Sequence, residues 1–544
     1  MSNRIYVADK DTLDEVNGKA DEIKASLQSV KEDTAKIETS IMSVSSGGIA
    51  PDNMRFFSVQ PADGKVKIKF QEPKDTYIDD QLICTWKGVK IVMKEGGYPE
   101  NEADGTVILD CTIAGKYAED YFEHGGLTND TQYFFQAFPY SDYGIYNRNA
   151  VNRAIATPQA YVLYGFKIAK KDSNPATRVT YTEMAVGKTP AKVNLSTGSF
   201  DYGDWADAWF VRDNVPCMVK NDGTIDYELD SNDYTKKKDG TGSDVSNSSY
   251  GGNAMSKIPL SWLKQWEDTN YYYCNICNIQ LTDDYKAFAH MRADGSVMDY
   301  TFLSCFEGSL VSSKIRSIKG LTPCNTQTGT NEITYAKANG NLWYTRTWSQ
   351  RNLINMLLIL MACSTNTQEA YGYGYYTGGS GSSPNYLQTG GASDKGQFYG
   401  TNATRNYVKV FHIENWWGDV WERIAGLIYD TSGKYKVKMY PDYNTGGSGY
   451  DVMSFGVTGT SGGYVSADNM SEHGMLPITV SGSETTYDCD GCWFNTSQSN
   501  YAIVGGGSFD GLRVGALCVS VNSLVSYSNW HIGVALSCEQ PVAA

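Results

Sequence analysis

The sequence contains no long hydrophobic run, and this absence excludes one large class of proteins. A membrane-spanning helix needs about 18 or more consecutive apolar residues. The longest apolar run, residues 357–363, is far shorter, so we expect no membrane insertion. Residues 1–10 also lack the apolar core of a secretory signal. We therefore expect a protein that is made in a cytosol and is not exported by a standard signal.

Cysteine, proline and positive charge are also scarce. The 544 residues include only 12 Cys and 15 Pro, and 46 Lys and Arg stand against 61 Asp and Glu, for a formal net charge of −15. So few cysteines do not make a disulfide scaffold. The acidic balance argues against nucleic acid as a partner, since phosphate binding needs a basic face. By contrast, 54 Gly and 39 Tyr are typical of a folded, mainly β chain with many loops.

Residues 13–44 carry apolar side chains in a repeat of seven. Two companion positions of this heptad hold Leu13, Val16, Ala20, Ile23, Leu27, Val30, Thr34, Ile37, Ile41 and Val44. This narrow seam is typical of an intermolecular coiled coil, whereas an amphipathic helix packed on its own chain carries a wider apolar stripe. We therefore predict a coiled-coil stalk over residues 1–46 and a linker over residues 47–53. β-Branched residues at one heptad position favour a coiled coil of two chains, but the residues at the companion position depart from that rule. The number of chains in the coiled coil therefore stays open.

Residues 54–158 alternate polar and apolar side chains in short runs, as half-buried strands do. Leu127, Thr128, Tyr133 and Ala137 have the spacing of a tyrosine corner, in which a Tyr hydroxyl bonds back to the preceding loop. In this spacing the segment resembles fibronectin type III domains. The resemblance implies a fibronectin type III-like β-sandwich that serves as a spacer.

Neither a linker nor an internal repeat interrupts residues 159–544, which we treat as one head domain. Residues 236–250 and 371–395 are long loops, and loops of that length are usually functional or mobile. Residues 348–363 are apolar enough for a buried helix, and residues 414–428 form a second helix candidate. The second candidate has apolar side chains at three-and-four spacing, namely Trp417, Val420, Trp421, Ile424 and Leu427.

Two parts of the head carry a further resemblance. Residues 414–422, Glu-Asn-Trp-Trp-Gly-Asp-Val-Trp-Glu, resemble a helix-start motif of the formylglycine-generating-enzyme type of C-type lectin fold, with Asp419 in place of the usual Asn. Residues 501–518 and 530–538 look like the C-terminal segment of phage tail-fibre and tropism proteins that retroelements diversify. Here Phe509 replaces a family Trp after the Gly run, and the usual closing Arg is absent.

The resemblance implies a phage tail fibre or receptor-binding protein whose C-terminal domain is C-type-lectin-like and diversified by a retroelement. The expected fold is mainly β with an α+β head, behind an N-terminal coiled coil and a fibronectin type III-like β-sandwich. The expected partners are a bacterial surface receptor, either glycan or protein, and other phage tail proteins through the N-terminus. By analogy with tail fibres we expect a homotrimer, located in the virion and made in the host cytoplasm.

The last segment predicts where the receptor binds. Leu517, Val519 and Val521 alternate with residues of an opposite face, as in a strand with one buried and one outward face. Alone, this pattern describes an ordinary closing strand pair. With the resemblance, we expect the outward residues and the polar loop 523–531 to contact the receptor. Tyr, Ser, Asn and Gly on a rigid frame are also typical of antibody-like binding surfaces. The predicted site is Phe509, Asp510, Val514, Cys518, Ser520, Asn522, Ser523, Val525, Tyr527, Asn529 and His531.

The motifs that could indicate an enzyme are weak matches. Residues 459–463, Gly-Thr-Ser-Gly-Gly, match a nucleophile elbow but lie in a Gly/Ser-rich stretch, where chance explains the match. Glu414, Asp419 and Glu422 would be the carboxylates of a tail-associated polysaccharide depolymerase, although helix capping also explains acids in a first turn. We therefore predict no enzyme activity and no catalytic residue. The depolymerase is the alternative, and a cellular adhesin of the same fold is a third.

Two Cys-x-x-Cys pairs are present, Cys274 with Cys277 and Cys489 with Cys492. A zinc site would need both pairs to converge across the chain, so buried free thiols are the simpler interpretation. The oxidase relatives of the resembled fold use a Cys-x4-Cys pair, and that spacing does not occur here. We predict no metal and no cofactor.

Overall fold

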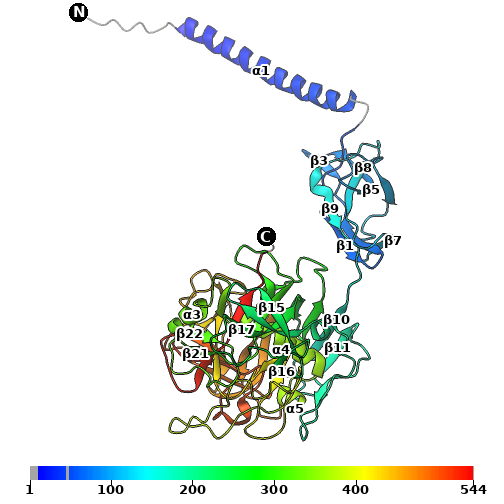
Figure 1. Ribbon diagram of the computed structural model, residues 1–544. Coiled ribbons are helices and arrows are strands. Elements are labelled where there is room, and N and C mark those ends of the chain that lie inside the picture. Colours follow the sequence, from blue (N-terminus) through cyan, green and yellow to red (C-terminus); the bar gives the residue numbers. More distant parts are fainter. Residues whose placement is uncertain (1–9, 45–47, 543–544) are drawn as a thin grey trace, which may run out of the picture. The chain divides into compact units, whose positions relative to one another are not determined.

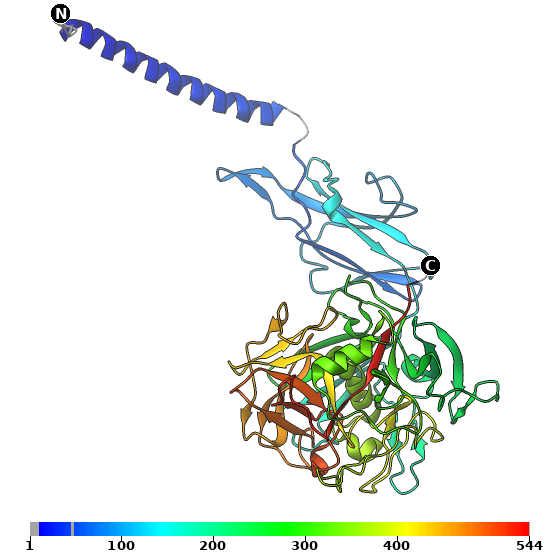
Figure 2. The ribbon, with the colours of Figure 1, turned by 60° about the vertical axis from the view of Figure 1, so that its left-hand side comes forward.

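The computed structural model describes residues 10–44 and 48–542 (Figures 1 and 2). The protein is mainly β, with 36% strand and 12% helix, so the mainly β class predicted from composition is confirmed. The chain divides into two compact units, Met1–Tyr161 and Val162–Ala544. In the described ranges no helix is both long enough and apolar enough to cross a membrane.

The first unit contains one long helix, α1, over Lys10–Val44. On it, Val16, Ile23, Leu27 and Val30 are between 56% and 62% exposed, so the apolar stripe of the heptad is uncovered in the single chain. The other apolar members of the seam with long side chains, Leu13, Ile37, Ile41 and Val44, have side chains outside the described residues.

The strands of the first unit form two antiparallel sheets and a hairpin. The sheet orders are β1-β2-β7 and β6-β5-β8-β9, and β3 pairs with β4. The strands are β1 Phe56–Ala62, β2 Lys65–Gln71, β3 Thr76–Ile78, β4 Gln81–Cys84, β5 Trp86–Glu95, β6 Thr106–Cys111, β7 Phe122–Gly125, β8 Tyr133–Ser141 and β9 Arg153–Ala156, with a short helix η1 at Ala150–Asn152. Ile68, Ile91 and Phe135 belong to the one core that both sheets share. The hydroxyl of Tyr133 accepts a hydrogen bond from the backbone N–H of Thr128 at 3.2 Å.

The second unit contains three larger sheets (Figure 1). The largest has the order β28-β27-β26-β33-β34-β32-β30-β31-β29, and β35 pairs with β26. Its strands are β26 Trp421–Tyr429, β27 Tyr435–Val437, β28 Asp451–Val452, β29 Thr458–Gly459, β30 Gly463–Ser471, β31 Gly474–Val480, β32 Gly491–Phe494, β33 Asn500–Val504, β34 Val519–Val521 and β35 Ile532–Val534.

The other two sheets have the orders β16-β15-β14-β17-β20-β36-β23 and β11-β10-β19-β18. Their strands are β10 Leu163–Ala169, β11 Val179–Glu183, β14 Val215–Lys220, β15 Ile225–Asp230, β16 Asp233–Lys237, β17 Gly252–Pro259, β18 Trp262–Glu267, β19 Tyr271–Cys277, β20 Tyr300–Ser304, β23 Trp343–Thr345 and β36 Leu536–Glu539. The remaining elements are α2 Trp209–Arg212, α3 Gly329–Lys337, α5 Thr367–Tyr371, η2 Phe288–His290, η3 Gly511–Arg513, and the two-stranded pairs β12 Lys192–Val193 with β13 Phe200–Asp201, β21 Ser309–Val311 with β22 Lys314–Arg316, and β24 Lys409–Val410 with β25 Ile413–Glu414.

The helix predicted over residues 348–363 is confirmed as α4, Trp348–Ala362. It starts at a capping box, in which Thr347 and Gln350 satisfy each other's backbone N–H groups, and it ends at Cys363 in the left-handed conformation. Nearly all of its side chains are buried, including the polar Arg351. A helix that is buried all round lies in the centre of a large core, which explains why its apolar run is nearly continuous.

The helix predicted over residues 414–428 is wrong. Asn415, Gly418 and Asp419 have φ values of 50°, 82° and 59°, which turn the chain sharply, and β26 then starts at Trp421. Every residue of β26 is buried. A strand that is covered on both faces loses its two-residue alternation, so the apolar spacing there resembled that of a helix.

Candidate functional site

A pocket of about 430 Å³ opens in the second unit, over the centre of its largest sheet. Trp421, Ile503, Ser520 and Trp493 line it from β26, β33, β34 and β32, which are consecutive strands of that sheet. Ser520 is the register partner of both Ile503 and Trp493, so these three side chains form a row across the sheet. The full lining is Trp421, Trp493, Gln498, Ile503, Phe509, Asp510, Ser520, Asn522, Ser523, Leu524, Tyr527 and His531.

Five of the twelve lining residues carry aromatic rings. Trp421 and Trp493 meet edge to face with ring centres 5.3 Å apart, and His531 lies 4.8 Å from Phe509 in the same type of contact. Phe509 and Tyr527 are 43% and 42% exposed, and they present their rings to solvent at the rim. Rings held in such contacts offer large apolar faces that need little further ordering when a ligand binds.

One carboxylate enters the pocket. Oδ2 of Asp510 accepts hydrogen bonds from Nε1 of Trp421 and from the backbone N–H of Gly507, each at 2.8 Å. Burial raises the pKa of Asp510 to about 6 despite these two bonds. The carboxyl group is therefore mostly ionised at neutral pH, and both bonds hold it against the wall.

Two amides give the pocket its polar surface. Oδ1 of Asn522 accepts hydrogen bonds from the hydroxyls of Ser520 and Ser523, at 2.8 and 3.0 Å. Nε2 of Gln498 donates to Oδ1 of Asn500 at 2.8 Å and to the carbonyl of Asn522 at 3.1 Å. Each amide thus uses one end for the protein, and no described residue bonds to Nδ2 of Asn522 or to Oε1 of Gln498, so both atoms can face a ligand.

His531 is a neutral part of the wall. Burial lowers its pKa to about 4, so the imidazole carries no charge at neutral pH. Its Nδ1 is buried and has no hydrogen-bond partner among the described residues. The ring contacts Phe509 and Trp530, at 4.8 and 5.2 Å between centres, and it acts there as an aromatic surface.

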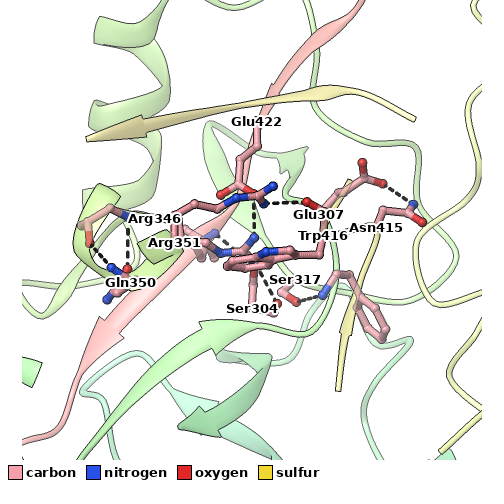
Figure 3. A network of polar contacts seen from close by, with 12 residues as sticks. Ser304, Glu307, Ser317, Arg346, Gln350, Arg351, Asn415, Trp416 and Glu422 are labelled. Carbon is pink, nitrogen blue, oxygen red and sulfur yellow. Dashed lines mark hydrogen bonds and ion pairs between the residues drawn. The ribbon is translucent and has the colours of Figure 1, made fainter. Parts of the chain in front are cut away.

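A buried cluster of arginines supports the strand that carries Trp421 (Figure 3). The guanidinium groups of Arg346 and Arg351 lie 4.8 and 4.4 Å from the centre of the Trp416 ring. Nη1 of Arg346 donates to Oε2 of Glu422 at 2.6 Å, and Nη1 of Arg351 donates to the carbonyl of Trp416 at 2.5 Å. All four residues are buried, so this network fixes the backbone that enters β26.

A second buried pair holds the loop that carries Tyr527. Nε of Arg423 donates to Oε2 of Glu332 at 2.6 Å, and Nη2 of Arg423 donates to the carbonyl of Tyr527 at 2.9 Å. The hydroxyl of Tyr527 itself accepts a hydrogen bond from Nδ2 of Asn529 at 2.5 Å. The exposed ring therefore stands on a backbone that the core positions.

The structure brings together seven of the eleven residues predicted as the receptor site. The seven that line the pocket are Phe509, Asp510, Ser520, Asn522, Ser523, Tyr527 and His531. Asn529 supports Tyr527 from outside the lining, and the half-buried Val525 packs against the core formed by Ile428, Tyr450 and Tyr501.

The prediction that Val514 and Cys518 contact a receptor is wrong, because both side chains are buried. Val514 is 0% exposed and fills the space beside Gly506, where a Cβ atom would lie 2.6 Å from its Cγ1. Cys518 is 1% exposed and packs with Ile503 and Ile532. At Cys518 the predicted outward face of the strand is thus covered, because Cys518 and Ile532 of β35 belong to one buried cluster.

Five lining residues were not predicted: Trp421, Trp493, Gln498, Ile503 and Leu524. The first four come from other strands and loops of the sheet, and only the folded chain brings them beside the C-terminal segment. Trp421 was already part of the quoted motif at residues 414–422, so an aromatic residue at the end of that motif was the available signal.

The three carboxylates considered for a depolymerase are buried and do not line this pocket. Glu414 accepts from the backbone N–H groups of Gly390 and Ala392, at 2.8 and 2.9 Å. Asp419 accepts from the N–H of Leu387, and Glu422 pairs with Arg346. Glu414 and Asp419 therefore hold the long loop over residues 371–395 in place.

All 12 cysteines are free, and all but Cys363 are buried, which includes both Cys-x-x-Cys pairs. Burial raises the pKa of Cys277 to about 11, and it raises the pKa values of the other three thiols of these pairs, Cys274, Cys489 and Cys492, further. All four thiols are therefore protonated at neutral pH. Within residues 10–44 and 48–542, no group of three or more His, Cys, Asp or Glu side chains is arranged to hold a metal ion.

A scan against protein-family models finds no match for this chain, and a search of the curated proteins finds none either. The geometry of the pocket and the resemblance in the sequence are therefore the two indications of function.

Proposed function

We propose that this protein is a phage tail fibre or receptor-binding protein, and that the pocket is its attachment site for a receptor on the bacterial surface. The observation that carries this proposal is the pocket itself. Seven of the residues predicted as receptor contacts line it, and buried strands and arginine pairs hold them. Exposed ligand contacts on a rigid frame are the arrangement that a variable binding site requires.

The proposed head is a C-type-lectin-like domain of the formylglycine-generating-enzyme type, with a C-terminal segment that a retroelement diversifies. The two segments that suggested this resemblance lie together, since β26 pairs with β33 and β35, and β33 pairs with β34. Their contact supports a common role in one site.

The proposed stalk is a coiled coil that joins copies into a homotrimer, and the proposed spacer is fibronectin type III-like. The uncovered stripe on α1 supports the first proposal, since 56–62% exposure of four apolar side chains is unfavourable in water. The bond between Tyr133 and Thr128 supports the second, because a tyrosine corner makes such a bond. Joined copies would bind with an avidity greater than the affinity of one site.

The proposal includes no catalytic role. In the pocket the only acid is Asp510, whereas glycoside hydrolysis usually needs two carboxylates that flank the bond. New reducing ends released from surface polysaccharide by the pure protein, and abolished by Asp510→Asn, would establish the depolymerase instead.

The test replaces pocket residues singly and measures attachment of fluorescently labelled protein to a panel of bacterial strains. Tyr527→Ala and Phe509→Ala should reduce attachment to every strain that the parent binds, because aromatic anchors usually dominate such sites. Tyr143→Ala is the matched control, since Tyr143 is a 75% exposed ring of the first unit. If both pocket variants attach as the parent does, the site lies elsewhere.

A further inference from the structure

The chemistry of the pocket also selects among receptors, and this inference rests on the proposed function. No lysine or arginine is among its lining residues, His531 is neutral, and Asp510 adds a negative charge. The whole chain has a formal net charge of −15. An acidic ligand, such as a uronic or sialic acid or a phosphate, would therefore meet the carboxylate of Asp510 and no cation of the lining, although the charge of Arg513, outside the lining, also acts on Asp510.

The free polar atoms suit a group that both donates and accepts hydrogen bonds. Nδ2 of Asn522 is a donor and Oε1 of Gln498 is an acceptor, and the other ends of both amides are engaged by the protein. Gln498 also donates to the backbone carbonyl of Asn522, which holds the side chain of Gln498 beside residue 522. Neighbouring hydroxyl groups on a ring can satisfy both atoms at once, because a hydroxyl can donate and accept.

The rings beside these amides supply flat apolar faces. Trp493 lies against bare backbone, since a Cβ atom on Gly462 would be 2.7 Å from its Nε1 and one on Gly491 would be 2.7 Å from its Cη2. Its ring is half-buried, and Phe509 and Tyr527 stand at the rim. A pyranose ring has apolar C–H faces and a polar edge, so it matches a site that is lined by both aromatic rings and amides.

We propose that the pocket binds a short neutral oligosaccharide of the bacterial surface, with a sugar ring stacked on its aromatic wall and hydroxyls bound by Asn522 and Gln498, and that no metal ion takes part. The volume of about 430 Å³ lies in the range of roughly 300–1,000 Å³ that is typical of small-ligand sites. Anionic glycans should bind this site more weakly, because the carboxylate of Asp510 repels them.

The test uses a glycan array with neutral gluco-, galacto- and manno-oligosaccharides beside uronic- and sialic-acid oligosaccharides, each with and without EDTA. The full-length parent should bind at least one neutral oligosaccharide, with unchanged signal in EDTA, and acidic ones more weakly. Asn522→Asp keeps the acceptor for both serine hydroxyls, replaces the amide donor by an acceptor and adds a negative charge, a change that the control below also makes. It should weaken binding about tenfold, as the loss of one hydrogen bond does.

Phe509→Leu keeps an apolar side chain at the rim and removes the ring, so it separates stacking from simple apolar contact. It should weaken binding about two- to tenfold. Asn232→Asp, an exposed amide outside the pocket lining, is the matched control and should bind as the parent does. Failure of the parent to bind any neutral glycan, or tighter binding of acidic ones, would overturn the inference.

A second experiment distinguishes a wrong sugar assignment from a wrong receptor site. Cells that the parent binds are treated either with periodate, which oxidises vicinal diols of sugars, or with protease. Loss after periodate supports the sugar. Loss only after protease, with Asn522→Asp and Phe509→Leu still impaired on untreated cells, overturns the sugar and leaves the receptor site in place. Unimpaired attachment by both variants overturns the site and the sugar together.

Discussion

Truncation of Ile532 should separate the frame of the pocket from its contact surface. Ile532 is 0% exposed and belongs to a small cluster with Trp421, Ile503 and Cys518, directly behind the pocket. Ile532→Ala removes three carbon groups, and at about 0.8 kcal/mol each the lost transfer free energy is about 2.4 kcal/mol. The cavity that remains adds to this, so the free energy of unfolding should fall by about 2–5 kcal/mol.

Two further variants give smaller expected losses of unfolding free energy for comparison. Ile532→Val removes one carbon group and should cost about 0.5–1.5 kcal/mol. Tyr527→Ala truncates a ring that is 42% exposed. It should cost about 1 kcal/mol at most, because a fully buried side chain of that kind contributes roughly 1.5–3 kcal/mol.

The assay is denaturant unfolding of the full-length protein, followed by tryptophan fluorescence because Trp421 contacts Ile532. Attachment to cells is measured for each variant at a temperature where the parent and variants are folded. The two Ile532 variants should lose stability in the order given and keep attachment, and Tyr527→Ala should do the reverse. If Tyr527→Ala unfolds as early as Ile532→Ala, the loop is part of the core and the separation of frame and contact surface is wrong.

Three other predictions follow from the described contacts. Ile23→Asp with Val30→Asp should shift the full chain from a multiple of 60.0 kDa to a single chain in light scattering while the circular dichroism of the β units is kept, and a monomeric parent at micromolar concentration would contradict the coiled coil. Burial raises the pKa of Asp510 in the folded state from about 3.8 to about 6, so the folded state binds this proton more tightly than the unfolded state, and the contribution of Asp510 to stability falls as pH rises from about 4 to 6. Asp510→Asn should therefore gain stability relative to the parent over that window, and a pH-independent difference in unfolding free energy would refute this. Tyr133→Phe leaves the N–H of Thr128 without its partner and should cost about 1 kcal/mol of unfolding free energy in the first unit, where an unchanged denaturation midpoint would count against the bond.

Some features could be predicted from the sequence because their periodicity survives folding. The heptad predicts a helix, and the structure has α1 there. The apolar run at residues 348–363 predicts α4, since a helix at the centre of a core is apolar along most of its length. Both cases depend on local pattern and need no knowledge of the rest of the chain.

Other features could not be predicted, because distant partners decide them. Arg346, Arg351 and Arg423 are buried, although charged residues ordinarily indicate surface. Their burial depends on Glu422, Glu332 and backbone carbonyls that lie far away in sequence. In the same way β26 looked like a helix, since both of its faces are covered by other elements.

The two faces of residues 517–522 limit where the proposed receptor contacts can vary. A strand at the centre of a sheet has two faces, and here Val519 and Val521 belong to one core while Cys518 belongs to a second cluster on the other side. Substitutions at Cys518 would disturb that cluster, whereas Asn522, Tyr527 and the exposed Leu524 can change at small cost. If the site varies as proposed, variation that is compatible with folding should therefore concentrate in the loops at the ends of β34, where the pocket meets solvent, while Val519 and Val521 of the strand stay constant to hold them.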